Sequence, residues 1–302
     1  MRKYAVVMSL ALAAAVAFAQ DAQPGHSGNA HIHLYPTKDR FVHQSAGPGG
    51  GSNLSYHGGP VLTQAKVVAI FWGSAWGTPQ SPSGIATSLT NFIDGNGSSI
   101  PGFGLTGEFN VITQYYGPTG AAIQQSNLGS AGGSLYDTGN PTSTNVTDAM
   151  MQQEVLKLTN NAPRTDTVYE VFIPNGYYSS SGSSDSCGGP NLQYCAYHGH
   201  FSFSGLDVKY ASMPYPSCGG CQSSGFSDTQ NLEHFISHET REAVTDEDLN
   251  AWFDRRGYEA DDKCAWSPTP FTDSATGVNA DNTPFAYQYE WSNANSGCVK
   301  TR

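Results

Sequence analysis

The sequence predicts an α/β or α+β layered single domain, with a mixed sheet and one helix that carries a candidate active site. Three observations support this fold class. Apolar runs typical of strands alternate with helical patterns over residues 67–173. A long helical segment at 229–245 holds histidines and carboxylates at helical spacing. All six cysteines follow residue 186, which predicts a C-terminal half stapled by disulfides.

The expected elements follow one another along the chain. A continuous apolar run at 67–72 predicts a buried strand, and the apolar spacing over 83–94, closed by Gly95, predicts a helix. Further strands are expected at 110–116, 168–173, 206–213 and 285–291, and a second helix at 144–158. Residues 177–200 are rich in Ser, Gly and Cys and are expected to be a loop, and residues 246–283 are turn-rich. Ser227 or Asp228 is the expected N-cap of the helix at 229–245.

The N-terminal part of the chain predicts export. Residues 1–19 combine Arg2 and Lys3 with an apolar run and small residues before Gln20, as in a secretory signal peptide. Residues 20–58 are rich in Gly, Ser and His and predict a flexible leader. His31 and His33 are expected to be solvated there, with weak metal binding as the alternative. A removed pro-segment is the alternative. Residues 59–302 are expected to form one domain.

The composition limits the kinds of partner that the chain is expected to bind. The chain has 302 residues, with 25 acidic against 14 basic ones, and this acidic balance argues against nucleic acid and anionic membranes. We expect a secreted, monomeric protein with no membrane contact after signal cleavage, in the extracellular space or alternatively in the periplasm. An extracellular peptide or a cell-wall polymer is the expected partner.

The cysteines predict three disulfides, since an even number in an exported chain is typical of structural bridges. The expected pairs, with the shortest loops first, are Cys187–Cys195, Cys218–Cys221 and Cys264–Cys298. A redox pair or half of a zinc site is the alternative for Cys218 and Cys221.

The candidate site centres on the helix at 229–245. His234, His238 and Glu242 lie at i, i+4 and i+8, on one helix face, with Glu239 beside them. This pattern resembles the zinc-binding His-Glu-x-x-His helix, with Glu242 in place of the second histidine, and it predicts a zincin-like arrangement. The alternative is a charged helix face that meets solvent.

A catalytic zinc site needs three protein ligands and one open position, so a further ligand is expected downstream. The nearest carboxylates are Glu259, Asp262 and Asp254, and a disulfide at Cys264 would hold the backbone of Asp262 in place. Glu259 is expected to be a ligand or to orient one; turn caps are the alternative. His198 and His200 are expected to be ordinary loop histidines, with a role as proton donor as the alternative.

The stretch from residue 236 to 264 resembles the central signature of the EXORDIUM/phosphate-induced protein 1 family. The likeness rests on the histidine and glutamates of the helix, on Asn250-Ala-Trp252 and on Glu259-Ala-Asp-Asp262-Lys-Cys264. The likeness to the family is weaker at residues 59–73, at Tyr194 to His198 and at Cys298. Glu247 and Asp261 depart from the family pattern, and His234 has no counterpart in it, which favours Asp262 over His234 as ligand. The resemblance implies a secreted extracellular or cell-wall protein without a settled biochemical activity.

These observations together predict a secreted zinc metallohydrolase that acts as a peptidase. Zn²⁺ is the expected cofactor, with Ca²⁺ as the alternative, and His238, Glu242, Asp262 and Glu259 are the expected ligands. Glu239 is the expected general base for zinc-bound water. The alternative function is a non-enzymatic extracellular or cell-wall-associated binding or signalling protein of the EXORDIUM type. A glycosidase is disfavoured, because Glu239 and Glu242 on one helix cannot easily flank a bond from two sides.

Overall fold

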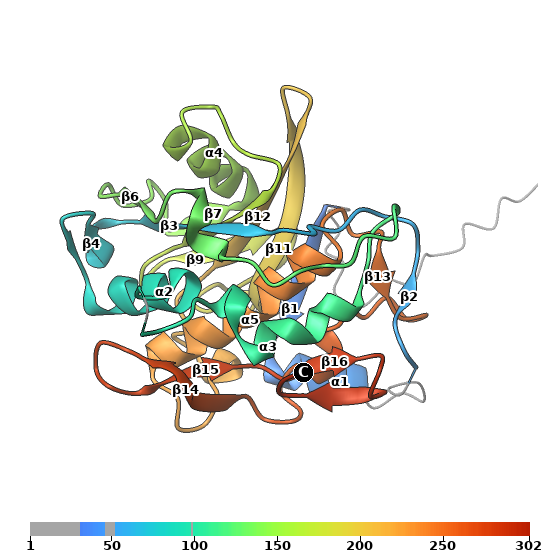
Figure 1. Cartoon of the computed structure of the whole chain (residues 1–302). Helices are drawn as coiled ribbons and strands as arrows, with labels where there is room; N and C mark the ends of the chain where they lie inside the picture. Colours follow the sequence, from blue (N-terminus) through green and yellow to red (C-terminus); the bar gives the residue numbers. More distant parts are fainter. Residues whose placement is uncertain (1–30, 46–51, 98) are drawn as a thin grey trace, which may run out of the picture.

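A six-stranded mixed sheet runs through the middle of the molecule (Figure 1). The computed structural model describes residues 31–45, 52–97 and 99–302, so the predicted signal peptide at 1–19 lies outside the described residues. In spatial order the strands are β1 (Ile32–Pro36), β11 (Tyr194–Phe203), β12 (Leu206–Met213), β8 (Thr167–Phe172), β3 (Lys66–Trp72) and β6 (Leu135–Asp137). Strands β12, β8, β3 and β6 are parallel, whereas β11 is antiparallel to both β12 and β1. The predicted mixed sheet is confirmed.

Helices cover both faces of this sheet, so its central strands are largely buried. The helices are α1 (Lys38–Ser45), α2 (Gly84–Asp94), α3 (Gly107–Asn110), α4 (Asp148–Leu158) and α5 (Asp228–Thr245). Along β3, Val67, Ala69 and Phe71 join the core on the side of α2 and α5. The alternate residues, such as Ile70, join a second core on the side of α4. The two-residue period of a strand thus supplies apolar side chains to both layers.

Short strands complete the fold around the sheet. A three-stranded sheet contains β7 (Asn145–Thr147), β9 (Tyr178–Ser181) and β10 (Ser184–Asp185). Two-stranded pairs are formed by β2 (Ser55–Tyr56) with β13 (Trp252–Phe253), β4 (Gly77–Thr78) with β5 (Ser81–Pro82), β14 (Phe271–Val278) with β15 (Pro284–Tyr287), and β16 (Glu290–Ser292) with β17 (Gly297–Val299). The strand expected at 285–291 is therefore split between β15 and β16, which pair with different partners.

Two predicted elements differ from the structure for local reasons. Residues 110–116, expected to be a strand, form the end of α3 and a 3₁₀ helix at Val111–Gln114. The Thr106 side chain caps α3 by accepting a hydrogen bond from the amide of Phe109, which starts the helical turns. The region 177–200, expected to be a loop, contains the beginning of β11. A two-residue turn with positive φ at Ser204 and Gly205 joins β11 to β12, and this turn fixes their antiparallel register.

The predicted flexible leader at 20–58 is wrong for its described central part. Strand β1 pairs with β11 over residues 32–36, and Tyr35 and Phe41 are buried in the main core. Leu54 also belongs to this core, so the folded unit begins well before residue 59. The pairing partner of β1 lies about 160 residues further along the chain, so no local sequence pattern predicts that the two strands pair.

Three disulfides staple the second half of the chain, as predicted, but only one predicted pair is correct. The bridges are Cys187–Cys218, Cys195–Cys221 and Cys264–Cys298. The expectation of shortest loops failed because β11 places Cys195 beside Cys221 rather than Cys187. These bridges indicate an oxidising environment. In the described ranges, no helix has both the length and the apolar character needed to cross a membrane.

Removing the Cys264–Cys298 bridge is expected to lower the free energy of unfolding by about 2–4 kcal/mol, because the bridge closes a long loop in the unfolded chain. The double variant Cys264→Ala/Cys298→Ala can be compared with Cys187→Ala/Cys218→Ala, whose loop has a similar length. Denaturant unfolding of both variants measures the loss. Similar losses are expected, and wild-type stability in the first variant would contradict the role assigned to its bridge.

Candidate functional site

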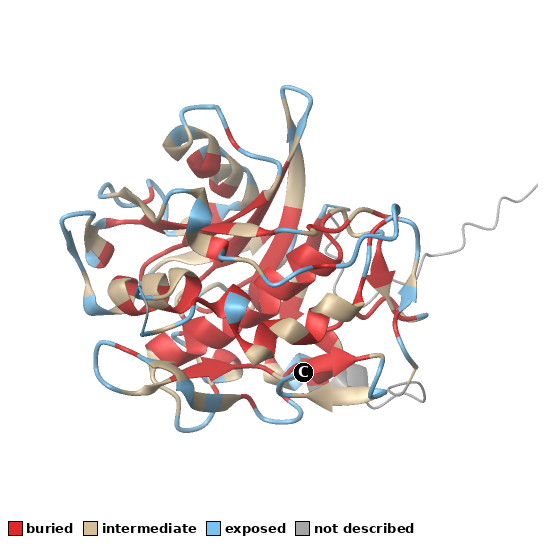
Figure 2. Cartoon of the chain, viewed as in Figure 1, coloured by how far each residue is buried: buried red, intermediate tan, exposed pale blue. Residues whose placement is uncertain are grey.

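The candidate site is built on α5. This helix is capped at its N-terminus and buried along its length. Ser227 and Gln230 form a reciprocal capping box there, so the predicted N-cap at Ser227 is confirmed. Every residue of α5 from Thr229 to Thr245 is buried, and Figure 2 shows the helix in red at the centre of the molecule. The alternative of a solvent-exposed charged helix face is therefore wrong.

Seven ionisable side chains converge beside α5, from five parts of the chain. Their exposed fractions lie between 0 and 3 %. They are His33 in β1, His198 in β11, His238, Glu239 and Glu242 in α5, Glu259 after β13, and Asp262 in a 3₁₀ turn at Asp262–Cys264. We call this set the His/carboxylate cluster. All five residues predicted for the metal or for catalysis belong to it.

The predicted ligands contact one another directly. His238 Nε2 lies 3.0 Å from Glu242 Oε2 and 4.0 Å from Asp262 Oδ1. The backbone amide of Asp262 donates a 2.9 Å hydrogen bond to Glu242 Oε1. On the other side of its ring, His238 Nδ1 lies 3.2 Å from Gln288 Oε1. A proton on Nδ1 donated to this amide oxygen leaves the Nε2 lone pair directed at the carboxylates, as a metal-binding histidine requires.

Two histidines of the cluster, His33 and His198, were not among the predicted site residues. His33 Nε2 lies 2.7 Å from Asp262 Oδ2, and its Nδ1 lies 3.1 Å from Glu259 Oε1. His198 Nδ1 lies 3.1 Å from Glu239 Oε2 and 3.7 Å from Glu242 Oε2. The two histidines are direct partners across the β1–β11 pair, so sheet register brings them together. The expectations of a solvated His33 and of an ordinary loop His198 are wrong.

The other predicted histidines lie outside the cluster. His234 is fully buried and packs against the aromatic rings of Tyr35, Phe235 and Trp266. Burial lowers its pKa to about 3, so this ring stays neutral. His200 is partly exposed and lies 2.8 Å from Asp207. The preference for Asp262 over His234 therefore agrees with where the two side chains lie.

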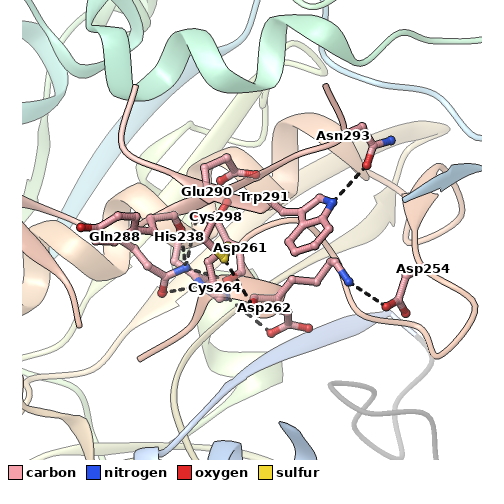
Figure 3. The surroundings of a disulfide bond; sticks show 12 residues. His238, Asp254, Asp261, Asp262, Cys264, Gln288, Glu290, Trp291, Asn293 and Cys298 are labelled. Atoms are coloured by element: carbon pink, nitrogen blue, oxygen red, sulfur yellow. Dashed lines mark hydrogen bonds and ion pairs between the residues drawn. A yellow bond between two sulfur atoms is a disulfide. The ribbon is translucent and has the colours of Figure 1, made fainter. Parts of the chain in front are cut away.

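A buried scaffold fixes the segment that carries Asp262. Arg241 contacts Asp261 through both its Nη2 and its Nε, and Nε also lies 2.8 Å from Glu290 Oε2. The Cys264–Cys298 disulfide lies close by, and Figure 3 shows it with Asp261, Asp262 and Glu290. Two residues beside Asp262 thus tie it to α5 and to the C-terminal strands, as the predicted disulfide at Cys264 suggested.

The electrostatics of the cluster favour bound positive charge. Burial raises the pKa of Glu239 well above its usual value, and the nearby Glu242 raises it further. Burial alone would lower the pKa of His33, but the charge and hydrogen bond of Asp262 outweigh it and raise this pKa to about 9. Glu242 acts in the same way on His238 and raises its pKa to about 8. The cluster therefore retains protons that the same groups would release in water.

These raised values predict a pH-dependent stability for zinc-depleted protein. The folded-state pKa of His33 exceeds the unfolded value of 6.5, so its stabilising contribution is complete below pH 6.5 and is lost as the pH rises through 9. We expect the free energy of unfolding to fall by roughly 3 kcal/mol over this interval. Denaturant unfolding in the presence of a chelator measures it. The variant His33→Asn should show a smaller decline, and an unchanged decline would contradict the assignment.

The donor set fits a divalent cation. Imidazole nitrogen and carboxylate oxygen are the usual zinc ligands besides thiolate. Within the described residues, Glu239 Oε1 is fully buried and accepts no hydrogen bond. Donors of His33, Glu242 and Asp262 lie within 4.8 Å of one another, as do those of His198, Glu239 and Glu242. The first group places Glu242 and Asp262 with His33 rather than with the predicted His238, whose Nε2 lies 3.0 Å from Glu242 Oε2, and Glu259 lies next to His33.

Comparisons with protein-family models, with curated proteins and with solved structures found no match to this chain. The resemblance to the EXORDIUM/phosphate-induced protein 1 family therefore remains a prediction from the quoted residues, and the zincin-like arrangement remains a prediction as well.

Proposed function

We propose that the chain is a secreted, zinc-dependent hydrolase that cleaves peptide bonds. The observation that carries this proposal is the convergence of three histidines and four carboxylates in one buried cluster, centred on the His-Glu-x-x-Glu pattern of α5. Buried charges of one sign are costly unless they are paired or bind a metal. A structural role alone would not require seven ionisable side chains at one point.

His238, Glu242 and Asp262 would hold the zinc, with Glu259 in support. His238 is oriented by Gln288, and Glu242 by the backbone amide of Asp262. When bound, the metal lowers the pKa of its water ligand and polarises a carbonyl group. Two carboxylate ligands give the zinc more negative charge than two histidines would, so a moderate reaction rate is expected.

Glu239 would act as the general base. It follows His238 directly and belongs to the same helix turn as Glu242, so its carboxylate reaches the same space. One oxygen, Oε2, lies 3.1 Å from His198 Nδ1, while Oε1 accepts no hydrogen bond from any described residue. Burial and Glu242 raise its pKa, which suits a group that takes up a proton near neutral pH. His198 would orient this carboxylate through its contact with Oε2.

The test is chelator-sensitive cleavage of a mixed library of unstructured peptides, read by mass spectrometry. Zinc-loaded protein is expected to cut the library at defined positions, and a chelator is expected to abolish the cutting until zinc is restored. Zinc-loaded protein that leaves every peptide intact would contradict the peptidase function. The non-enzymatic binding protein would then be the better description.

A further inference from the structure

Strand β1 closes the candidate site, although a hydrolase needs access to its substrate. All members of the His/carboxylate cluster are at most 3 % exposed. Two side chains of β1 contribute to this closure. His33 contacts Asp262 and Glu259, and the ring of Tyr35 stacks on His238 with 3.9 Å between ring centroids. An element that lies against both a predicted ligand and its neighbours must move before a polypeptide can reach them.

The position of β1 is that of a bound peptide. It lies at the edge of the sheet and pairs with one strand only, β11, in antiparallel register. Its alternate side chains point to opposite faces of the sheet, as they do in a peptide that is recognised by strand addition. His33 and Tyr35 enter the site, whereas Ile32 and Leu34 pack into the core on the opposite sheet face. The main-chain pairing is independent of side chains, so another extended segment can form it.

Strand β11 is suited to receive such a segment. Gly199 lies opposite Ile32 in the pairing register. A Cβ atom built at Gly199 would lie 2.3 Å from the carbonyl oxygen of His31, closer than two such atoms can approach. The glycine therefore permits the close approach of a strand at the point where β1 enters the sheet.

His33 also fills the position that catalysis requires to be open. If His238, Glu242 and Asp262 held the metal, His33 would supply a fourth donor, since its Nε2 lies 2.7 Å from Asp262 Oδ2. Closed sites with four protein donors are structural, whereas catalytic zinc sites keep one position for water or substrate. With β1 in place, four protein donors would surround the metal, and without β1 one position would be left for water or substrate.

On the basis of the hydrolase function proposed above, we propose that β1 is an internal inhibitor that occupies the substrate's place. The substrate class is an extended polypeptide segment that pairs antiparallel with β11 once β1 leaves. His33 then acts as a displaceable ligand rather than a permanent one.

The test uses the full chain with a specific protease site introduced between Ser45 and Ser52, so that cutting leaves the N-terminal segment held without a covalent link. The probe is a fluorescein-labelled synthetic peptide with the sequence of residues 31–45. Fluorescence anisotropy is expected to show that the cut chain binds this probe at least tenfold more tightly than the uncut chain, with its zinc retained. A probe carrying His33→Ala and Tyr35→Ala should bind at least tenfold more weakly. A probe with Asp39→Asn, an exposed position, should bind like the original.

Cleavage of the peptide library provides the second readout. The cut chain is expected to work at least tenfold faster than the uncut chain, and the unlabelled 31–45 peptide should inhibit it competitively. In the uncut chain, His33→Ala should keep its zinc. Loss of zinc in His33→Ala, or loss of zinc or unfolding after release of the segment, would overturn the proposal. Probe binding by a cut chain that holds zinc but cleaves nothing would instead contradict the hydrolase function and leave the peptide-binding edge in place.

Discussion

The variant Glu239→Gln is expected to keep its zinc and to lose peptide cleavage by a factor of about 10²–10⁴, the range typical of a lost general base. Glutamine has the same shape as glutamate and can still accept the hydrogen bond from His198, so the cluster should remain assembled. What it cannot do is take the proton from the attacking water. The measurement is kcat on a defined peptide substrate, together with the zinc content of the same preparation.

Glu233→Gln is the matched control for this variant. Glu233 lies on the same helix, is fully buried and accepts a 2.9 Å hydrogen bond from the amide of Ala286, away from the cluster. Burial raises its pKa well above the usual value, so an uncharged amide is a close replacement for it. We expect activity within a factor of about two of wild type. Cleavage at the wild-type rate by Glu239→Gln would remove Glu239 from the mechanism.

The variant Arg241→Met is expected to lower the free energy of unfolding by about 3–5 kcal/mol, the usual cost of removing one partner from a buried ion pair. The guanidinium is fully buried and contacts Asp261 and Glu290, which are also fully buried, and it donates to the carbonyl oxygens of Glu108 and Gln288. Methionine fills much of the space but leaves two carboxylates without their cation. Because Asp261 precedes Asp262, weaker zinc binding is expected as well.

Arg164→Met serves as the comparison for Arg241→Met. Arg164 also pairs with an aspartate, Asp166, at 2.7 Å, but both side chains are more than 40 % exposed. Exposed ion pairs contribute less than about 1 kcal/mol, so this variant should unfold close to wild type. Denaturant unfolding of both variants gives the two values. Equal losses in the free energy of unfolding would contradict the claim that burial makes the Arg241 ion pairs more stabilising than an exposed pair.

The parts of the fold that the sequence predicted are those with strong local signals. Strand β3 has a continuous apolar run, β8 and β12 contain β-branched and aromatic residues, and α5 has both a periodic pattern and a Ser227 cap. The three neighbouring strands β12, β8 and β3 and the helices α2, α4 and α5 followed from these signals. Strand β11 escaped prediction because it contains two histidines and a glycine within six residues, and its pairing with β12 depends on the turn at Ser204 and Gly205.

The candidate site was predictable only where its residues are close in sequence. His238, Glu239 and Glu242 follow from helix spacing, and Asp262 from its distance to Cys264. His33 and His198 depend on the pairing of β1 with β11, which joins segments about 160 residues apart. Such a contact is created by sheet register and has no local pattern, although the His31-Ile-His33 sequence is a local signal of metal binding for one of these two residues.

The central claim is that the His/carboxylate cluster holds zinc, and elemental mass spectrometry of purified protein tests it most directly. Wild type, His238→Ala and His57→Ala are compared, since His57 is exposed and lies outside the cluster. The account predicts one zinc per chain in wild type and in His57→Ala, and less than about a tenth of this amount in His238→Ala. Folded wild-type protein that binds no zinc when zinc is supplied, or a folded His238→Ala that keeps its full content, would contradict it.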